Sequence, residues 1–202
     1  MKLLLENWRK FINEEEGPSS PLDLKLNPDQ KILALREPWK GFPSGLNSRK
    51  AQKTHVKPEG IWYGCGDSWL KWMDREKPEW LDAVNYIYEL ELDQEFILTI
   101  TNKEQFKRFE QEYWGRAPWQ GRGGWTETGP PDGQYERIEW DTLVGQYDGI
   151  EICPYLEEFR NSTSRWYYTW DVASGCIWDS QSLIGEPKLL WQRDTDEGEE
   201  EE

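Results

Sequence analysis

The 202-residue chain contains one histidine, three cysteines and two methionines, and it lacks any long apolar run. A helix that crosses a membrane needs about 20 predominantly apolar residues, and no window of this sequence approaches that length. The apolar start at residues 1–5 is also too short for the core of a secretory signal, which takes about 7–15 residues. We therefore expect no contact with a membrane and a cytoplasmic location.

The scarce cysteines and the single histidine exclude several kinds of site. Cys65, Cys153 and Cys176 are odd in number and form no Cys-x-x-Cys pair, which argues against a disulfide framework and against structural zinc. They predict buried free thiols in a reducing compartment. His55 lies in a lysine-rich segment with no nucleophile next to it, so it does not indicate a catalytic triad. Neither a P-loop nor a dinucleotide-binding glycine motif is present.

Basic residues are also in short supply. Lysine and arginine number 24 against 39 acids, giving a net charge of −15, which argues against nucleic-acid binding because phosphates need a basic face. Seven of the acids fall within the last nine residues, and such a block is typical of a solvated tail. An alternative is that the carboxylates imitate nucleic-acid phosphates.

Aromatic residues are abundant, with 14 tryptophans, nine tyrosines and six phenylalanines. Each can bury roughly 150–250 Å², so they predict a compact aromatic core despite the modest content of other apolar residues. We expect an N-terminal leader helix in residues 1–17, one globular domain in 18–193 and a disordered acidic tail in 194–202.

The hydrophobic patterns predict an α+β fold of short elements. Strands are expected at 31–35, 60–64, 86–92, 96–100, 149–153, 166–170, 175–178 and 188–192. Helices are expected at 2–15, 68–75, 103–113 and 138–147, with Asn102 as the cap of the third. Residues 114–135 are rich in glycine and proline and are expected to form a long surface loop.

Four stretches carry a resemblance to a known family: GIWYGCGDSWLKW at 60–72, YIYELELD at 86–93, YDGI at 147–150 and SGCIWDSQSLI at 174–184. Together they resemble the ADP-ribosyltransferase catalytic domain of the poly(ADP-ribose) polymerase and diphtheria-toxin type. The start of the chain is similar to that of small uncharacterised proteins of T4-like marine phages. For a phage protein, the cytoplasm would be that of the host.

The resemblance implies small split antiparallel or mixed sheets around a cleft that holds NAD⁺. It implies that Trp62 or Tyr63 stacks on the nicotinamide ring and that backbone groups near Gly60 hold the carboxamide. Arg36 would contact the phosphates or the nicotinamide ribose. The segments 60–63, 149–153 and 175–178 are then expected to be strands that come together around this cleft.

The sequence departs from the family at one catalytic position, because Ser174 stands where the family has a glutamate. A hydroxyl cannot replace a carboxylate against the positive charge of the transition state. Asp171 is the preferred substitute, ahead of Glu151, Glu157 and Glu158. The other possibility is that the chain binds NAD⁺ without catalysing a transfer.

A second hypothesis comes from a different class of protein. In it, the chain is a non-catalytic interaction module that uses its tryptophan-rich surface, leader helix and acidic tail to engage a host or virion protein. The two hypotheses differ at the cleft. The enzyme requires Arg36, an aromatic from 62–63 and a carboxylate in one pocket, whereas the interaction module requires only exposed aromatic residues.

Overall fold

The computed structural model describes residues 18–43, 46, 57–118, 134–161 and 166–194. Its strands are β1 (Lys31–Leu35), β2 (Ile61–Cys65), β3 (Tyr86–Leu90), β4 (Ile97–Ile100), β5 (Trp114–Pro118), β6 (Gln134–Ile138), β7 (Gly149–Ile152), β8 (Ser174–Ile177) and β9 (Lys188–Gln192). Its α-helices are α2 (Ser68–Glu76), α3 (Pro78–Asp82), α4 (Lys103–Tyr113) and α5 (Trp140–Val144). Short 3₁₀ helices are η1 (Pro21–Asp23), η2 (Gln94–Phe96), η3 (Glu157–Phe159), η4 (Tyr167–Thr169) and η5 (Ser180–Ser182).

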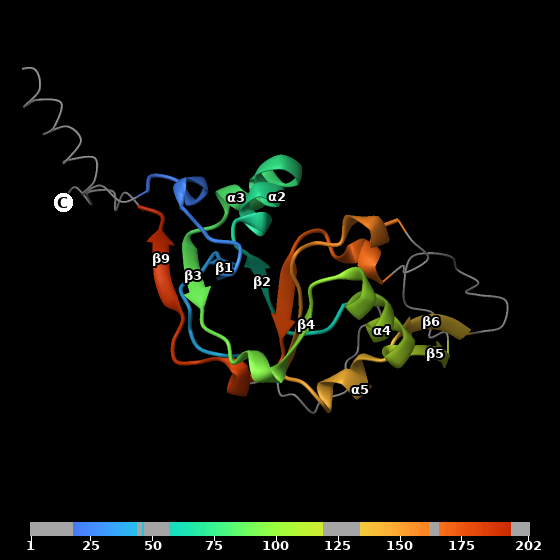
Figure 1. Ribbon diagram of the computed structural model, residues 1–202. Helices are drawn as coiled ribbons and strands as arrows, with labels where there is room; N and C mark the ends of the chain where they lie inside the picture. Colours follow the sequence, from blue (N-terminus) through green and yellow to red (C-terminus); the bar gives the residue numbers. More distant parts are fainter. Residues whose placement is uncertain (1–17, 44–45, 47–56, 119–133, 162–165, 195–202) are drawn as a thin grey trace, which may run out of the picture.

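Seven strands form one mixed sheet in the order β4-β7-β8-β2-β1-β3-β9. Strands β4 and β7 are parallel, and every other neighbouring pair in this sheet is antiparallel. Strands β5 and β6 form a separate hairpin beside α4 and α5 (Figure 1). The α+β class expected from the sequence is therefore confirmed, and segments 60–63, 149–153 and 175–178 do contribute to three adjacent strands, β2, β7 and β8.

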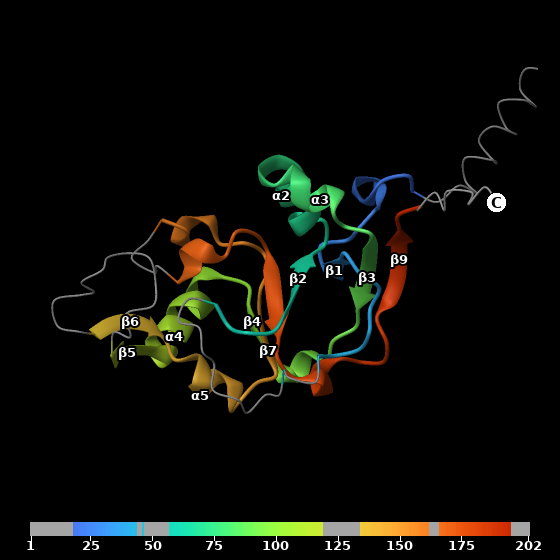
Figure 2. The ribbon, with the colours of Figure 1, turned by 180° about the vertical axis from the view of Figure 1, so that it is seen from behind.

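The seven-stranded sheet curls around an apolar interior. Leu90 of β3 and Ile97 of β4 belong to one buried cluster, although their strands lie near opposite ends of the sheet. We call this cluster the inner core; its buried members are Leu33, Tyr63, Cys65, Tyr88, Leu90, Leu92, Ile97 and Ile177. Figure 2 shows β3 and β9 on one side of this interior and β4 and β7 on the other.

Helices cover the outside of the curl. Helices α2 and α3 pack on the β1–β3–β9 half through a cluster that includes Leu70, Met73 and Ile87. Helices α4 and α5 pack on the β4–β7–β8 half through a cluster dominated by aromatic rings. In that cluster Phe106 stacks on Phe159 at 4.2 Å between ring centroids, which confirms the aromatic core expected from composition.

Strands β1 and β2 are joined over a very short length. Their register contains two pairs, Lys31 with Cys65 and Ile32 with Gly64. Beyond Ile32, β1 continues to pair with β3 and β2 continues to pair with β8, so the two strands diverge. The sheet is thus continuous but nearly divided at this joint, and the divergence is what opens the site described below.

Several local expectations are confirmed. The strands at 31–35 and 188–192 have the expected bounds, as does helix 103–113. The Asn102 side chain accepts a 3.0 Å hydrogen bond from the backbone N–H of Gln105, so it caps that helix. The expected helix at 138–147 is shorter, since α5 covers Trp140–Val144 only.

Two segments differ from expectation. The ends of the expected loop at 114–135 form the β5–β6 hairpin, in which Trp114 pairs with Ile138. The segment 166–170 is not a strand but contains the single turn η4. Tyr167 and Trp170 are both fully buried three residues apart, a spacing that places them on one side of a 3₁₀ turn. Residues 119–133 lie outside the described residues.

The expectation of three free cysteines is wrong for two of them. Cys65 and Cys153 form a disulfide with Cα atoms 6.5 Å apart, while Cys176 is free and buried. The expectation of a reducing, cytoplasmic location rested in part on unpaired cysteines, and these two cysteines no longer support it. None of the helices in the described segments is long and apolar enough to cross a bilayer. The leader helix, His55 and residues 195–202 lie outside the described residues.

Candidate functional site

Two adjoining hollows lie where β1 and β2 diverge, and residues of both strands line the larger one. The larger has a volume of about 390 Å³ and the smaller about 130 Å³, and Trp69 and Trp80 line both. We call the pair the aromatic groove. The larger hollow falls within the size range of about 300–1,000 Å³ that small-molecule sites occupy.

The larger hollow brings together two residues that the sequence singled out. Arg36 follows β1 directly, and Trp62 lies near the start of β2, on the unpaired side of the divergence. The Arg36 side chain is exposed, whereas Trp62 is half-buried and packs edge-on against Trp170 with 4.7 Å between ring centroids. The pocket thus combines a fixed aromatic wall with an accessible cation.

Helix α2 supplies the opposite aromatic wall. Its buried residues Leu70 and Met73 face the core, which turns Trp69 and Trp72 toward the groove. Gly64 of β2 allows the helix to lie this close, because a Cβ there would be 2.8 Å from the Cβ of Trp69. Any larger residue at this position would push α2, and with it Trp69, away from the sheet.

The smaller hollow contains Asp171, Lys57 and Ser174. The Asp171 carboxylate lies 3.8 Å from Lys57 Nζ and 3.9 Å from Arg160 Nη2. Lys57 Nζ also lies 4.9 Å from the centroid of the Trp62 ring, a cation–π contact. Burial lowers the pKa of the Lys57 ammonium, and the charge of Asp171 opposes this shift.

Ser174 is 2 % exposed, and its hydroxyl donates a 2.9 Å hydrogen bond to the backbone carbonyl of Val172. The hydroxyl is therefore engaged within its own chain segment. Of the candidate carboxylates, Asp171 lines the groove, whereas Glu157 and Glu158 are exposed on η3. Gly60 abuts β8 instead, where a Cβ would meet the carbonyl oxygen of Ile177 and the sulfur of Cys176.

Tyr63 and Glu151 lie on the opposite face of the sheet, in the inner core. Tyr63 is 1 % exposed and packs in the inner core, so of the two neighbouring rings only Trp62 lines the groove. The Tyr63 hydroxyl donates a 2.9 Å hydrogen bond to Glu151 Oε2, and Lys31 Nζ donates a 2.7 Å hydrogen bond to Oε1. Burial, and secondly the charge of Glu151, raises the pKa of Tyr63 well above its usual range, so this phenol stays a donor.

The inner core thus holds a second polar group that the sequence patterns did not reveal. We call Lys31, Tyr63, Glu151 and the Cys65–Cys153 disulfide the inner polar cluster. Glu151 is 3 % exposed and, with Ser174 and Ser182, is one of three buried polar residues among those that the structure describes. Cys65 lies two residues after Tyr63, and Cys153 lies two residues after Glu151. This shared spacing indicates one common site only when β2 and β7 are known to flank the same strand, β8.

Comparisons with protein-family models, with curated protein sequences and with solved structures gave no significant match. The chain's own geometry is therefore what supports a function.

Proposed function

We propose that the chain is an ADP-ribosyltransferase-like protein that binds NAD⁺ in the aromatic groove. The observation that carries this proposal is the divergence of β1 and β2, which places Arg36 and Trp62 in one hollow. Arg36 directly follows β1 and Trp62 lies on β2, and the resemblance assigns both to the same ligand. Their position in one hollow supports NAD⁺ binding there.

The chemistry of the groove fits such a ligand. The nicotinamide and adenine rings are flat, and tryptophan side chains offer large flat surfaces for stacking. Arg36 provides a guanidinium for the diphosphate, a pairing that is favoured because a guanidinium matches phosphate oxygens in two-point hydrogen bonding. The larger hollow alone is small for a dinucleotide, so we place the nicotinamide ring against Trp62 and its ribose at the boundary with the second hollow, where Trp69 and Trp80 line both hollows and Asp171 lines the second.

If the groove is catalytic, Asp171 is the carboxylate that acts. The reaction breaks the bond between the ribose C1′ and the nicotinamide nitrogen, and nicotinamide leaves with the bonding pair. A nucleophile, water in the simplest case, attacks C1′ and gives up a proton. Asp171 would stabilise the positive charge on the ribose and receive that proton. Lys57 and Arg160 would hold the Asp171 carboxylate in position.

Calorimetric titration with NAD⁺ tests binding. We expect heat of binding for the wild-type chain, its loss in Trp62→Ala and at least a tenfold weaker affinity in Arg36→Ala. The matched control is Trp114→Ala, which removes a 36 % exposed tryptophan on β5 outside the groove. Absence of binding at millimolar NAD⁺, or equal loss in the Trp114 variant, would overturn the proposal.

Release of nicotinamide, followed by liquid chromatography, tests catalysis separately. Asp171→Asn should abolish release while leaving the NAD⁺ affinity within about threefold of wild type. If wild-type protein binds NAD⁺ and releases no nicotinamide with water or with candidate host proteins, the groove binds the ligand without turning it over.

A specific observation also favours the interaction module. Trp80 lines both hollows and is 45 % exposed, so the groove presents a large apolar ring to solvent. In that case a host protein, and not a nucleotide, would cover the rings. A protein partner identified by cross-linking should then lose affinity in Trp80→Ala, and NAD⁺ should not compete with it.

A further inference from the structure

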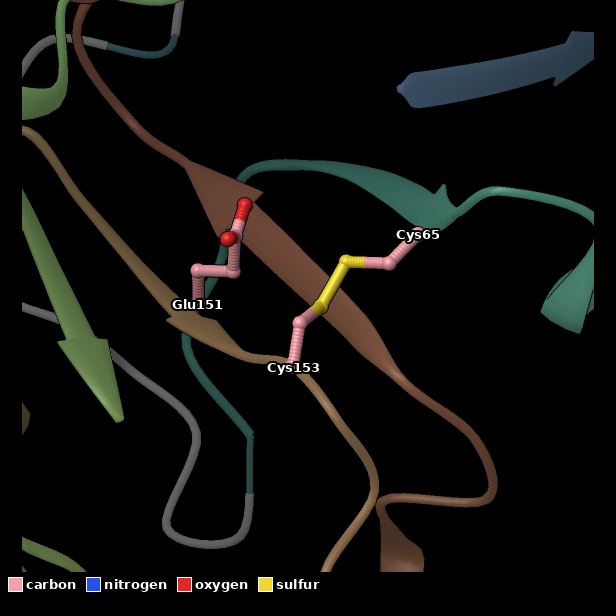
Figure 3. Close-up of side chains that lie close together, drawn as sticks. All are labelled: Cys65, Glu151 and Cys153. Carbon is pink, nitrogen blue, oxygen red and sulfur yellow. A yellow bond between two sulfur atoms is a disulfide. The ribbon is translucent and has the colours of Figure 1, made fainter. Parts of the chain in front are cut away.

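The inner polar cluster brings three metal-binding side chains together. The sulfur atoms of Cys65 and Cys153 and a carboxylate oxygen of Glu151 all lie within 4.8 Å of one another. Figure 3 shows Cys65 at the end of β2, Glu151 on β7 and Cys153 just after β7, with all three side chains on the same side of β8. Cys65 and Glu151 are buried and Cys153 is half-buried, so the cluster has a partly accessible side.

We propose that this cluster binds Zn²⁺ once the Cys65–Cys153 disulfide is reduced, with both thiolates and Glu151 as ligands. Two thiolates and one carboxylate are a ligand set that zinc accepts, and a water molecule can complete the tetrahedral shell. The proposal concerns the inner face of the sheet and does not depend on NAD⁺ binding in the aromatic groove.

The geometry of the sheet holds the ligands in place without the disulfide. Tyr63 pairs with Gly175 of β8, and Gly175 pairs with Glu151 of β7, so the three residues form one row across the sheet. Cys65 ends β2 two residues after Tyr63, and Cys153 directly follows β7 two residues after Glu151, so both belong to the next row. The backbone N–H of Cys65 donates a 3.0 Å hydrogen bond to Ala173, which keeps β2 in register. Strand pairing thus keeps the two sulfurs close to each other.

The polar neighbours support a metal-binding role for Glu151. Tyr63 donates to one carboxylate oxygen and Lys31 to the other, which fixes the orientation of the carboxylate. Each oxygen has a second lone pair that can reach a metal ion. Donors behind a ligand are the usual means of orienting it, and they commonly change metal affinity by about 10–100-fold.

The charges also balance. Lys31 pairs with Cys65 across β1 and β2, and its ammonium forms an ion pair with Glu151. In the disulfide form, the cluster contains one positive charge on Lys31 and one negative charge on Glu151. In the zinc-bound form, the two thiolates of Cys65 and Cys153 add two negative charges, which neutralise the two positive charges of Zn²⁺. The buried site is formally neutral in both states, which avoids the cost of an uncompensated buried charge.

The conversion between the two states is a thiol–disulfide exchange followed by metal binding. Two molecules of a thiol reductant give two electrons to the disulfide, are themselves joined as a disulfide and leave Cys65 and Cys153 as thiols. Zn²⁺ then displaces two protons and forms two zinc–sulfur bonds. The metal-bound form requires no further oxidant or reductant.

Cobalt titration of the full chain tests the site, because Co²⁺ substitutes for Zn²⁺ and absorbs light when thiolates bind it. After anaerobic reduction, we expect one Co²⁺ per chain with sulfur-to-metal charge-transfer absorption, and displacement of the cobalt by Zn²⁺. The oxidised chain should show neither. Zn²⁺ should raise the melting temperature of the reduced chain and leave that of the oxidised chain unchanged.

Variants separate the proposed site from adventitious binding. Cys153→Ser should abolish the charge-transfer band, and Glu151→Gln should weaken Co²⁺ binding at least tenfold. The matched control is Cys176→Ala, which removes the buried cysteine on the other face of the sheet and should bind cobalt as wild type does. Circular dichroism identifies any variant that fails to fold.

Two outcomes overturn the proposal. One is a folded, reduced wild-type chain that shows no thiolate-to-cobalt band at millimolar Co²⁺. The other is a band that survives Cys153→Ser or disappears in Cys176→Ala. Because NAD⁺ titration of the oxidised chain does not involve the cluster, failure here leaves the proposed function to be judged by its own experiment.

Discussion

The Tyr63 hydroxyl reaches Glu151 by crossing the strand between them, and its ring lies directly over Gly175. Tyr63 lies on β2 and Glu151 on β7, with β8 between. A Cβ on Gly175 would occupy the same space as the Tyr63 ring. The disulfide crosses the same strand one row further along. Two links, one a hydrogen bond and one covalent, therefore connect β2 and β7 over the top of β8.

Gly175→Ala should break the first of these links. The added methyl group displaces the Tyr63 ring and leaves the buried Glu151 carboxylate without one donor, so we expect a loss of about 2–4 kcal/mol in unfolding free energy. Denaturant unfolding measures the loss. Gly145→Ala is the matched control, because its Cβ would have its nearest neighbour at 3.5 Å, and it should change stability by less than about 0.5 kcal/mol. Equal effects in both variants would contradict the explanation.

Glu151→Gln should be strongly destabilising. It leaves the Lys31 ammonium, whose side chain is 14 % exposed, without its carboxylate, and such a loss typically costs about 3–5 kcal/mol. Adding Lys31→Met removes the unpaired charge, so the double variant should recover part of the stability. A double variant less stable than Glu151→Gln alone would show that the ion pair is not what stabilises this part of the core.

Replacing both Cys65 and Cys153 with alanine should lower stability in the absence of metal. The disulfide joins residues 88 positions apart, and the entropy of closing a loop of that length predicts a loss of roughly 4–5 kcal/mol. Thermal unfolding of the oxidised wild type against the double variant measures it. Cys176→Ala controls for the removal of a buried sulfur and should cost much less.

Asp148→Asn should stabilise the protein at neutral pH. Burial, and secondly the charge of Asp179, raises the pKa of Asp148 above its ordinary 3.8, so the folded state holds this proton more tightly than the unfolded state does. That contribution is present below about pH 3.8 and is lost as pH rises through the folded-state pKa. The variant should therefore melt about 1–2 °C higher at pH 7, with the difference vanishing below pH 4. A difference that persists at pH 3 would contradict this cause.

Local chemistry made much of the secondary structure predictable. The side chain of Asn102 and the apolar spacing of Phe106 and Phe109 are sufficient to define α4, because capping and burial both act within a few residues. The short hairpin β5–β6 was not predictable because β6 begins 16 positions after the end of β5, and β5 itself contains Gly115 and Pro118. Pairing at such a distance depends on contacts that no local pattern records.

The site shows the same division. Arg36, Trp62 and Asp171 could be proposed from the sequence, and all three line the aromatic groove. The sequence could not decide which of Trp62 and Tyr63 lines the groove. Strand alternation places the two rings on opposite faces of the sheet but does not identify the face on which the groove lies. The disulfide was not predictable, since Cys65 and Cys153 come together only because β8, which follows both in the chain, inserts between their strands.

The short joint between β1 and β2 also has a mechanical meaning. Only two residue pairs connect β1 and β2 there, whereas β1 and β3 share five pairs. This joint has the fewest residue pairs of any in the seven-stranded sheet, and the aromatic groove lies along its open side. A ligand bound between Arg36 and Trp62 would contact both strands beside this joint. The hydrogen-exchange rates of the Ile32 and Gly64 amides, which lie where the two halves of the sheet meet, should therefore change when the groove is occupied.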